Sequence, residues 1–345
     1  MSTTERYVLT GPHGLDSLRR ESVPLPPLGD DDVHVRMRAW SMNYRDLAMP
    51  HGGYIANDKV KTDPPLVPLS DGCGEVVDVG DNVRDLAVGD RVASCFFPDW
   101  DDGELTREGI ASALGGATDG VLARDVVLPS KAWMKVTGEH SFAEAATFPC
   151  AAVTAWQALS LGNQAADQTV LLLGTGGVSI FALQLASAMG MRVIQTSSSD
   201  AKLERAIGLG ATATINYRTT PQWDDEVLKL TDGVGVDHVV EVGGAGTLEK
   251  SLRAARVSGR ISLIGVLSGM PEQNPSPMSV LFKRLTMQGI YVGSRAMFSD
   301  FLAFYERHRL QPVIDERFGF ENVRDAYECM QNAGHFGKIV IEDHS

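Results

Sequence analysis

The feature that most constrains this chain is a short apolar run that ends in a glycine-rich turn. Residues 169–173 (TVLLL) have the composition of a strand buried on both faces of a parallel sheet. The turn GTGGVS, residues 174–179, follows directly, and apolar residues from Val178 to Met189 then recur at helical spacing. A buried strand, a glycine turn and a helix in this order predict a nucleotide-binding βα unit.

Each glycine of such a turn has its own task. The first allows the tight turn and the second lets a pyrophosphate approach the backbone, while the third position packs the helix on the strand. Gly174 and Gly176 take the first two tasks, and Gly177 and Val178 open the helix. The third position holds Ser179 instead of Gly or Ala, which is a small departure from the pattern.

Strands and helices keep alternating after this unit. Asp200 is expected to cap a helix that runs to about Leu209. The further strands expected are 192–196, 213–217, 236–242, 260–265 and 285–292. This alternation is typical of an α/β fold and predicts a Rossmann, doubly wound parallel sheet.

The rest of the chain has a different rhythm. Residues 33–40 alternate polar and apolar side chains as a half-buried strand does, and Ser141 and Glu144 form a capping-box pattern. Other elements expected are strands at 75–79, 90–94, 121–128 and 338–341 and helices at 299–308 and 322–332. A chain of 345 residues suits about two domains. We expect a β-rich domain at 1–150, completed by 293–345, and a nucleotide-binding domain at 151–292.

Composition disfavours several kinds of partner. The chain has 31 Lys and Arg against 44 Asp and Glu, a net charge of −13, which opposes binding to nucleic acid or to an anionic membrane. Its four cysteines show no CxxC spacing, which argues against a zinc lobe or a disulfide framework. Residues 168–191 carry no charge, but the glycine turn interrupts them, so they do not read as a membrane span. The first six residues lack a signal-peptide pattern, and we expect a cytoplasmic protein with a small-molecule substrate.

The end of the second strand indicates which dinucleotide is bound. An NAD site places an acidic residue about 20 residues after the first glycine, where it binds the ribose 2′-hydroxyl. Here that region holds Ser197 and Ser198, and the first acid is Asp200. Hydroxyl groups and the nearby Lys202 suit a 2′-phosphate, which a carboxylate would repel. The pattern favours NADP(H); the alternative is that Lys202 is an ordinary solvent-exposed residue.

Over nearly its whole length, the sequence resembles the medium-chain dehydrogenase/reductase superfamily. The resemblance rests on the GTGGVS turn and on the closing segment HFGKIV at 335–340. It implies that the first domain is GroES-like and catalytic. Zinc alcohol dehydrogenases of that superfamily carry a Cys-x-x-Asp string, a Gly-His-Glu string and a later Cys. The matching positions here read Asn43 to Asp46 (NYRD), Leu69 to Asp71 (LSD) and Cys150.

Only one of these positions keeps its zinc ligand. A catalytic zinc needs three protein ligands, and Asn43 and Ser70 are poor replacements for a thiolate and an imidazole. We therefore expect no zinc, with Cys150 as a plain buried thiol. The zinc-free quinone oxidoreductase branch is the nearer relative by this resemblance.

That branch implies a set of site residues. Asn43, Asp46 and Tyr54 would line the active site, although a second tyrosine of the branch falls on Ala48 here. Lys202 and Tyr217 would bind the 2′-phosphate of NADPH. The complete set expected to bind the cofactor is Thr154, Gly174, Gly176, Gly177, Val178, Ser197, Ser198, Lys202, Tyr217, Val242, Gly243, Gly265 and Val266. A homodimer is expected chiefly by resemblance, with residues 285–292 pairing across a two-fold axis.

Without a metal ion, the acceptor itself must tolerate the negative charge that hydride transfer creates. Reducing a simple ketone forms an alkoxide with a basicity near that of hydroxide, whose conjugate acid has a pKa of about 15.7. Reducing a quinone forms a phenolate-like oxygen, whose conjugate acid has a pKa of about 10. This gap corresponds to about 7–8 kcal/mol, more than the roughly 3–4 kcal/mol that one oxyanion donor supplies. Quinones and α,β-unsaturated carbonyls are therefore the expected acceptors, with Asn43 and Tyr54 as donors and Asp46 orienting them.

Several alternatives stay open at this stage. The chain could be an alcohol dehydrogenase, with a weakly bound metal at Asp71 and Cys150 or with a non-metal donor, or a non-catalytic nucleotide-binding protein of the lens-crystallin kind. Asp46 could simply accept hydrogen bonds from backbone N–H groups, and Tyr54 could be a pocket-rim aromatic. The aromatic and acidic segment 96–103 is either a surface loop or a wall of a substrate pocket.

Overall fold

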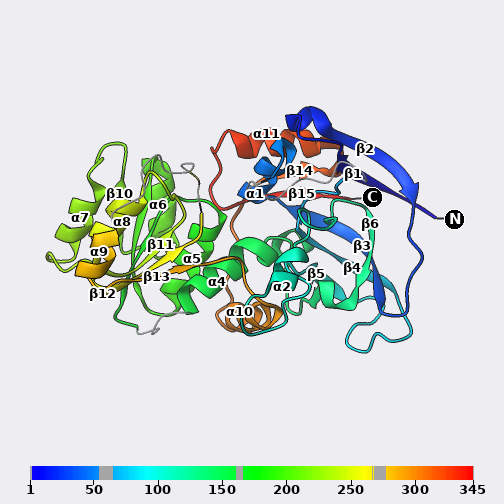
Figure 1. Cartoon of the computed structure of the whole chain (residues 1–345), viewed down its shortest axis with the longest axis horizontal. Helices are drawn as coiled ribbons and strands as arrows, with labels where there is room; N and C mark the ends of the chain where they lie inside the picture. The colour runs from blue at the N-terminus through cyan, green and yellow to red at the C-terminus, as the bar shows by residue number, and fades with distance from the viewer. Residues whose placement is uncertain (1, 54–64, 161–165, 266, 268–276, 345) are drawn as a thin grey trace. The chain divides into compact units, whose positions relative to one another are not determined.

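The computed structural model describes residues 2–53, 65–160, 166–265, 267 and 277–344. It divides into two compact units, the first formed by Met1–Val153 and Val292–Ser345 and the second by Thr154–Tyr291 (Figure 1). No helix within the described ranges has the length and apolar character that a membrane span requires. All four cysteines are free thiols.

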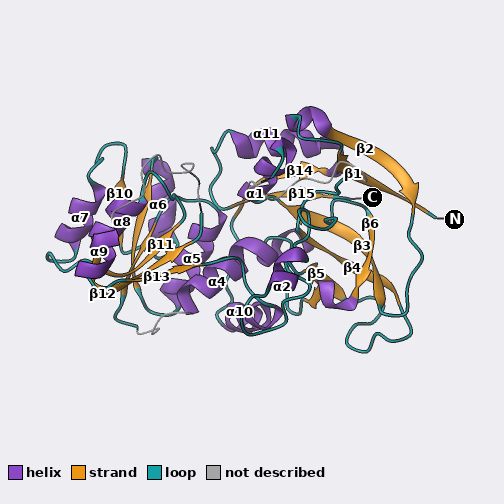
Figure 2. Ribbon diagram, viewed as in Figure 1, coloured by secondary structure: helices purple, strands orange, loops and turns teal. Residues whose placement is uncertain are grey.

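The second unit is a parallel sheet joined by helices (Figure 2). Its strands are β8 (Thr169–Leu172), β9 (Arg192–Ser197), β10 (Ala213–Asn216), β11 (Val236–Glu241), β12 (Ala255–Leu263) and β13 (Thr286–Gly289). Its helices are α4 (Val153–Ser160), α5 (Gly177–Ala188), α6 (Asp200–Gly208), α7 (Trp223–Leu230), α8 (Leu248–Ala254) and α9 (Pro277–Phe282). The apolar side chains of β8 from Val170 to Leu172 are fully buried, which explains why this strand is a continuous apolar run.

The strand order of this sheet confirms the predicted doubly wound fold. Neighbouring strands follow the order β10-β9-β8-β11-β12-β13, and every pair is parallel. The chain winds outward from β8 to β10 in one direction and from β11 to β13 in the other. The winding therefore reverses between β8 and β11, and in such sheets ligands bind outside the carboxyl ends of the strands at this point.

The first unit is β-rich and contains both ends of the chain. Its strands are β1 (Thr3–Leu9), β2 (Leu18–Pro24), β3 (Asp32–Ser41), β4 (Asp71–Val79), β5 (Arg91–Ser94), β6 (Asp125–Pro129), β7 (Trp133–Lys135), β14 (Ile314–Gly319) and β15 (Lys338–Glu342). Its helices are α1 (Tyr44–Ala48), α2 (Arg107–Ala111), α3 (Phe142–Ala145), α10 (Arg295–Arg307) and α11 (Val323–Gln331), with the short turns η1 (Gly14–Ser17), η2 (Met49–His51), η3 (Ser130–Ala132), η4 (Phe148–Ala152) and η5 (Phe320–Asn322). The main sheet follows the order β14-β15-β3-β4-β5-β7, with β6 also paired to β3, so the last strand of the chain lies beside β3.

Some predicted boundaries were wrong, each for a local reason. Asp200 does not cap α6: the N-cap is Ser199, whose hydroxyl accepts from the backbone N–H of Lys202. The strand expected at 121–128 begins only at Asp125, because the N–H groups of Val121 and Leu122 bond to an irregular segment at 68–69. The strand expected at 260–265 starts earlier as β12, and the one expected at 285–292 is the shorter β13.

The capping box predicted at Ser141 is confirmed and gives a test of local stability. The Ser141 hydroxyl accepts from the N–H of Glu144, and the Glu144 carboxylate accepts from the N–H of Ser141 at 2.7 Å. We expect Ser141→Ala to lower the free energy of unfolding by about 1 kcal/mol, measured by urea denaturation. The exposed strand residue Ser22 provides a control, since Ser22→Ala should change stability by no more than about 0.5 kcal/mol. Equal effects of the two changes would show that the cap contributes nothing.

Candidate active site

The glycine turn between β8 and α5 has the open backbone that a pyrophosphate needs. Gly174 has a φ of +69°, which residues with a side chain rarely adopt. A Cβ built on Gly174 or Gly176 meets no atom within 4 Å, so the space beside both Cα atoms is free. Gly177 and Val178 begin α5, where backbone N–H groups point away from the helix and can bind an anion.

Two buried polar side chains hold this turn in place. Ser179 donates from its hydroxyl to the carbonyl of Leu173 at 2.6 Å, which ties the helix back to the strand. Gln195 of β9 is fully buried and donates from Nε2 to the carbonyl of Gly174 at 2.5 Å. Sequence analysis did not identify Gln195 as part of the site. The available signal was a polar residue inside an otherwise apolar buried strand.

Hydroxyl groups lie at the end of β9, where the sequence predicts the 2′-phosphate. Ser197 is buried with its Oγ 3.4 Å from the Thr175 hydroxyl, and its carbonyl accepts from the N–H of Tyr217 at 3.0 Å. Ser198 and Lys202 are half-buried at the start of α6. The structure therefore brings the end of β9 next to Tyr217.

Asp200, the first acidic residue after β9, forms a hydrogen bond with another side chain. Asp200 accepts from Nδ2 of Asn216 at 2.7 Å, and Asn216 in turn accepts from the N–H of Arg218 through its Oδ1 at 3.0 Å. This engagement gives the carboxylate a partner other than a ribose hydroxyl.

Glu241, at the end of β11, shapes the loop that contains the predicted cofactor residues Val242 and Gly243. Its fully buried carboxylate accepts from the N–H groups of Gly243 and Gly244 at 2.7 and 2.9 Å. The hydroxyls of Thr247 and Ser251 donate to the same carboxylate. Sequence analysis missed this residue, although an acid between two valines at the end of a buried strand signals a local hydrogen-bonding role.

Three further predicted cofactor residues are described by the structure, and one is not. Val242 is buried, and a Cβ on Gly265 would collide with its carbonyl, so the two loops are in close contact. Thr154 is buried in the first turn of α4. Val266 lies outside the described residues.

In the first unit, sheet pairing brings Lys338 next to Asn43. β3 lies between β15 and β4, and Ser41 pairs with Val340 on one side and with Asp71 on the other. Two residues before Val340, the side chain of Lys338 is 3% exposed, and its Nζ donates to Oδ1 of Asn43 at 2.7 Å and to the carbonyl of Met42 at 2.6 Å. The sequence pattern alone gives Lys338 no role; its one signal is a lysine at the start of an otherwise apolar strand.

Asp46 holds the start of α1. Its carboxylate is fully buried and accepts from the backbone N–H of Asn43 through Oδ2 at 2.7 Å. Burial raises the pKa of this carboxyl to about 6, against the opposing effect of the neighbouring Arg45 guanidinium. Asp46 thus acts on Asn43 through the backbone, while Tyr54, the third predicted catalytic residue, lies outside the described residues.

The three positions that match zinc ligands converge around Asp71. The Asp71 carboxylate accepts from the Ser70 hydroxyl at 2.7 Å and from the backbone N–H of Cys150 at 3.1 Å. Burial raises the pKa of Asp71, and the Asn43 amide and the Lys338 ammonium are among the groups that oppose this. We call Asn43, Asp46, Ser70, Asp71, Cys150 and Lys338 the buried polar cluster.

The side chains of this cluster do not suit a zinc ion. Burial raises the pKa of the Cys150 thiol to about 12, and the three matching positions offer this one thiol alone, whereas a catalytic zinc takes three protein ligands. Asn43 and Ser70 offer an amide and a hydroxyl, and the Asp71 carboxylate already accepts two hydrogen bonds. Within the described part of the chain, no group of three His, Cys, Asp or Glu side chains is arranged to hold a metal ion.

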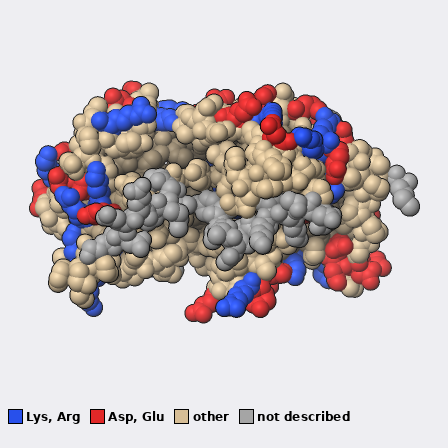
Figure 3. Space-filling view, turned by 45° about the horizontal axis from the view of Figure 1, so that its top comes forward, with Lys and Arg blue, Asp and Glu red and all other residues tan. Residues whose placement is uncertain are grey.

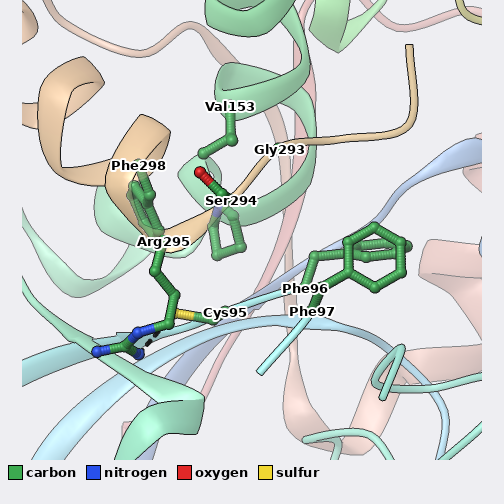
Figure 4. Close-up of a pocket in the computed structure, with 9 residues that line it drawn as sticks. Cys95, Phe96, Phe97, Val153, Gly293, Ser294, Arg295 and Phe298 are labelled. Atoms are coloured by element: carbon green, nitrogen blue, oxygen red, sulfur yellow. Dashed lines mark hydrogen bonds between the residues drawn. The ribbon is translucent and has the colours of Figure 1, made fainter. Parts of the chain in front are cut away.

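The aromatic segment at 96–103 contributes to a small pocket beside this cluster. Phe96 and Phe97 are buried and line it together with Ser294 and Phe298 (Figure 4). The pocket holds about 190 Å³ of empty space, part of it open to solvent. The Arg45 guanidinium lies 4.2 Å from the Phe96 ring centre and so connects the pocket to the start of α1.

The chain is similar to known proteins along nearly its whole length. Residues 29–138 match the family described as alcohol dehydrogenase GroES-like domain, and residues 177–307 match zinc-binding dehydrogenase. A zinc-type alcohol dehydrogenase-like protein of Schizosaccharomyces pombe is 43% identical over 95% of this chain and 96% of its own. A quinone oxidoreductase-like protein 2 homolog of Nematostella vectensis is 30% identical over 91% of this chain and 82% of its own. The crystal structure of an NAD-dependent alcohol dehydrogenase, 31% identical, superposes with a TM-score of 0.87 and covers 98% of this chain and 99% of that one.

A doubly wound sheet with an open glycine turn, joined to a GroES-like unit, defines an NAD(P)-dependent oxidoreductase. The chain belongs to the medium-chain dehydrogenase/reductase superfamily.

The raised pKa of Asp46 predicts a pH-dependent stability. A carboxyl whose pKa rises from 3.8 to about 6 on folding stabilises the fold while it is protonated, and this contribution is lost as the pH rises through about 6. Asp46→Asn removes the titration but keeps an oxygen for the N–H of Asn43. Between pH 4 and pH 7, the unfolding free energy of this variant should therefore gain about 2.4 kcal/mol relative to the parent.

Urea denaturation of both proteins across this pH range measures the difference. Asp102→Asn, at an exposed loop position, is the matched control and should show no such trend. A constant difference between Asp46→Asn and the parent at every pH would contradict the assignment.

Proposed function

We propose that this protein is a zinc-independent, NADPH-dependent oxidoreductase that transfers hydride to a conjugated acceptor, either a quinone or an α,β-unsaturated carbonyl compound. The observation that carries the proposal is the buried polar cluster. At its converging positions an amide, a hydroxyl and a neutral thiol stand where the zinc enzymes of the superfamily have metal ligands. Neutral hydrogen-bond donors supply enough stabilisation for a phenolate or an enolate. A more basic alkoxide requires more stabilisation than such donors supply.

The residues of this chain serve the acceptor by hydrogen bonding and positioning. NADPH supplies the hydride when it is bound. Nδ2 of Asn43 is buried and has at most the Asp71 carboxylate as a partner, so at least one of its two N–H groups can donate to the oxygen that gains negative charge. We assign Tyr54 as the second donor or the proton source, with water as the alternative source. Asp46 positions Asn43 through the backbone N–H at the start of α1.

The preference for NADPH rests on the end of β9. Ser197, Ser198, Lys202 and Tyr217 provide hydroxyl groups and a positive charge, whereas the nearest carboxylate, Asp200, bonds to Asn216. This arrangement attracts the 2′-phosphate of NADPH. The strand end itself carries no carboxylate to accept a hydrogen bond from the ribose 2′-hydroxyl of NADH. The NAD dependence of the 31% identical structure points the other way, which makes cofactor preference a direct test.

We further propose that the protein forms a homodimer and acts on a small molecule. β13 is the edge strand of the parallel sheet and all four of its residues are exposed, as are Leu281 and Phe282 on the neighbouring α9. An edge of this kind can pair with a second copy. Acidic and basic side chains lie next to one another on the face in Figure 3, and with a net charge of −13 the surface does not favour a nucleic-acid partner.

A substrate panel with metal analysis tests the reaction class. We expect the purified protein to oxidise NADPH with quinones or enones, to turn over unconjugated ketones at least about 100-fold more slowly, and to contain less than about 0.1 zinc per chain. The measurements are loss of absorbance of the reduced nicotinamide and elemental analysis. About one zinc per chain with brisk turnover of simple alcohols would instead establish the alcohol dehydrogenase that the zinc-type relative suggests. Tight NADPH binding without turnover of any acceptor would favour a non-catalytic protein.

Lys202 tests the cofactor assignment. Lys202→Ala removes a charge-assisted hydrogen bond to the 2′-phosphate. The KM for NADPH should therefore rise about tenfold or more, while the KM for NADH should stay within about twofold. Ser197→Asp should add a repulsive charge at the same place and further favour NADH. Lys229→Ala, at an exposed position of α7, is the control and should change neither KM. Equal changes for both cofactors would remove Lys202 from the 2′-phosphate site.

A further inference from the structure

Lys338 is a buried cation whose strongest contacts are to the proposed oxyanion donor and its neighbour. Its Nζ donates to Oδ1 of Asn43 at 2.7 Å and to the carbonyl of Met42 at 2.6 Å. Burial lowers the pKa of Lys338, while the nearby Asp71 and Asp46 carboxylates act to keep it charged. An ammonium at 3% exposure has little water to share its charge, so the Asn43 amide experiences it directly.

The contact decides which way the Asn43 amide faces. An asparagine at a helix N-cap usually turns its side-chain oxygen to the N–H groups of its own helix. Here Lys338 also donates to that oxygen, and the Asp46 carboxylate completes the capping box at the helix start by accepting from the N–H of Asn43. Nδ2 must then face away from the ammonium, where it is buried and forms no hydrogen bond of regular geometry. Asp71 lies on this side of the amide, and a hydrogen bond from the Asn43 side chain helps to lower the Asp71 pKa; this interaction engages at most one of the two N–H groups of Nδ2.

A cation on the amide oxygen also strengthens the donor at the other end. Hydrogen bonds in a chain polarise one another, and a bond from a charged donor is roughly twice as strong as a neutral one. Withdrawing electron density through the amide makes the N–H groups of Nδ2 more acidic. A buried donor that lacks a partner in the protein is costly unless a ligand satisfies it.

We propose that Lys338 is a positioning residue for the reaction: it fixes the orientation of the Asn43 amide and polarises it, so that Nδ2 stabilises the oxyanion of the acceptor. The inference rests on the proposed function and deepens it, because it names the residue that orients and polarises the proposed oxyanion donor.

A double-mutant cycle tests the coupling. Asn43→Ala should lower the single-turnover rate of NADPH oxidation about 100-fold, and Lys338→Met about tenfold. If Lys338 acts through Asn43, adding Lys338→Met to Asn43→Ala should cost no more than about twofold. Lys338→Arg should recover most of the rate, and the exposed control Lys229→Met should not change it. Multiplicative losses in the double variant would overturn the proposal.

A second variant keeps the test sharp if Lys338→Met does not fold. Asn43→Asp keeps a partner for the ammonium but replaces the Nδ2 donor with an oxygen. The proposal predicts the same loss of about 100-fold as for Asn43→Ala, together with a retained thermal midpoint. An Asn43→Asp protein with parental rates would show that the Lys338 contact only supports the fold.

Binding of 4-nitrophenol in the presence of NADP⁺ provides a measurement that needs no turnover. The phenolate form resembles the oxyanion, so Lys338→Met should weaken its binding about tenfold and leave the neutral phenol within about twofold, as followed by absorbance titration above and below the ionisation of the phenol. Equal losses for both forms would overturn the role of Lys338. Selective loss of phenolate binding in a protein that reduces no conjugated acceptor would support this role and end the proposed function instead.

Discussion

The burial of the Lys338 ammonium is the constraint on which the first unit depends. An ionised amine without water needs acceptors and counter-charges, and the pairing of β15 with β3 supplies both. The carbonyl of Met42 and the amide of Asn43 accept its hydrogen bonds, while Asp71 and Asp46 lie close enough to favour its charged form. Since Lys338 acts on both carboxylates, and Arg45 acts on Asp46 as well, the charges of the buried polar cluster depend on one another.

The same cluster accounts for the chemistry that we propose. Several of its polar groups bond to one another: Asp71 accepts from Ser70 and from the N–H of Cys150, and Asp46 accepts from the N–H of Asn43 through Oδ2. The cluster also holds a neutral, buried N–H donor on Asn43. A donor of this strength supports negative charge on a phenolate or an enolate, whereas a simple alkoxide demands a Lewis acid.

In the second unit, buried polar side chains hold two loops in their conformations. Gln195 bonds to the carbonyl of Gly174 in the turn after β8, and Glu241 bonds to the N–H groups of Gly243 and Gly244 after β11. These two strands flank the point where the winding of the sheet reverses. The loops carry no regular hydrogen-bonding ladder of their own, so the side chains beneath them take its place and keep the backbone ready for a ligand.

Local patterns in the sequence determined the parallel sheet, the glycine turn and the capping box at Ser141, because apolar periodicity, glycine and capping residues act over a few neighbouring positions. Motif matches also identified Asn43, Asp46, Ser70, Asp71 and Cys150 as one group. The role of Lys338 came only from the tertiary structure, since the strand pairing that sets its ammonium against Asn43 joins residues 295 positions apart. The roles of Gln195 and Glu241 also came only from the tertiary structure, because the fold decides which backbone groups lie within hydrogen-bond distance of a buried polar side chain.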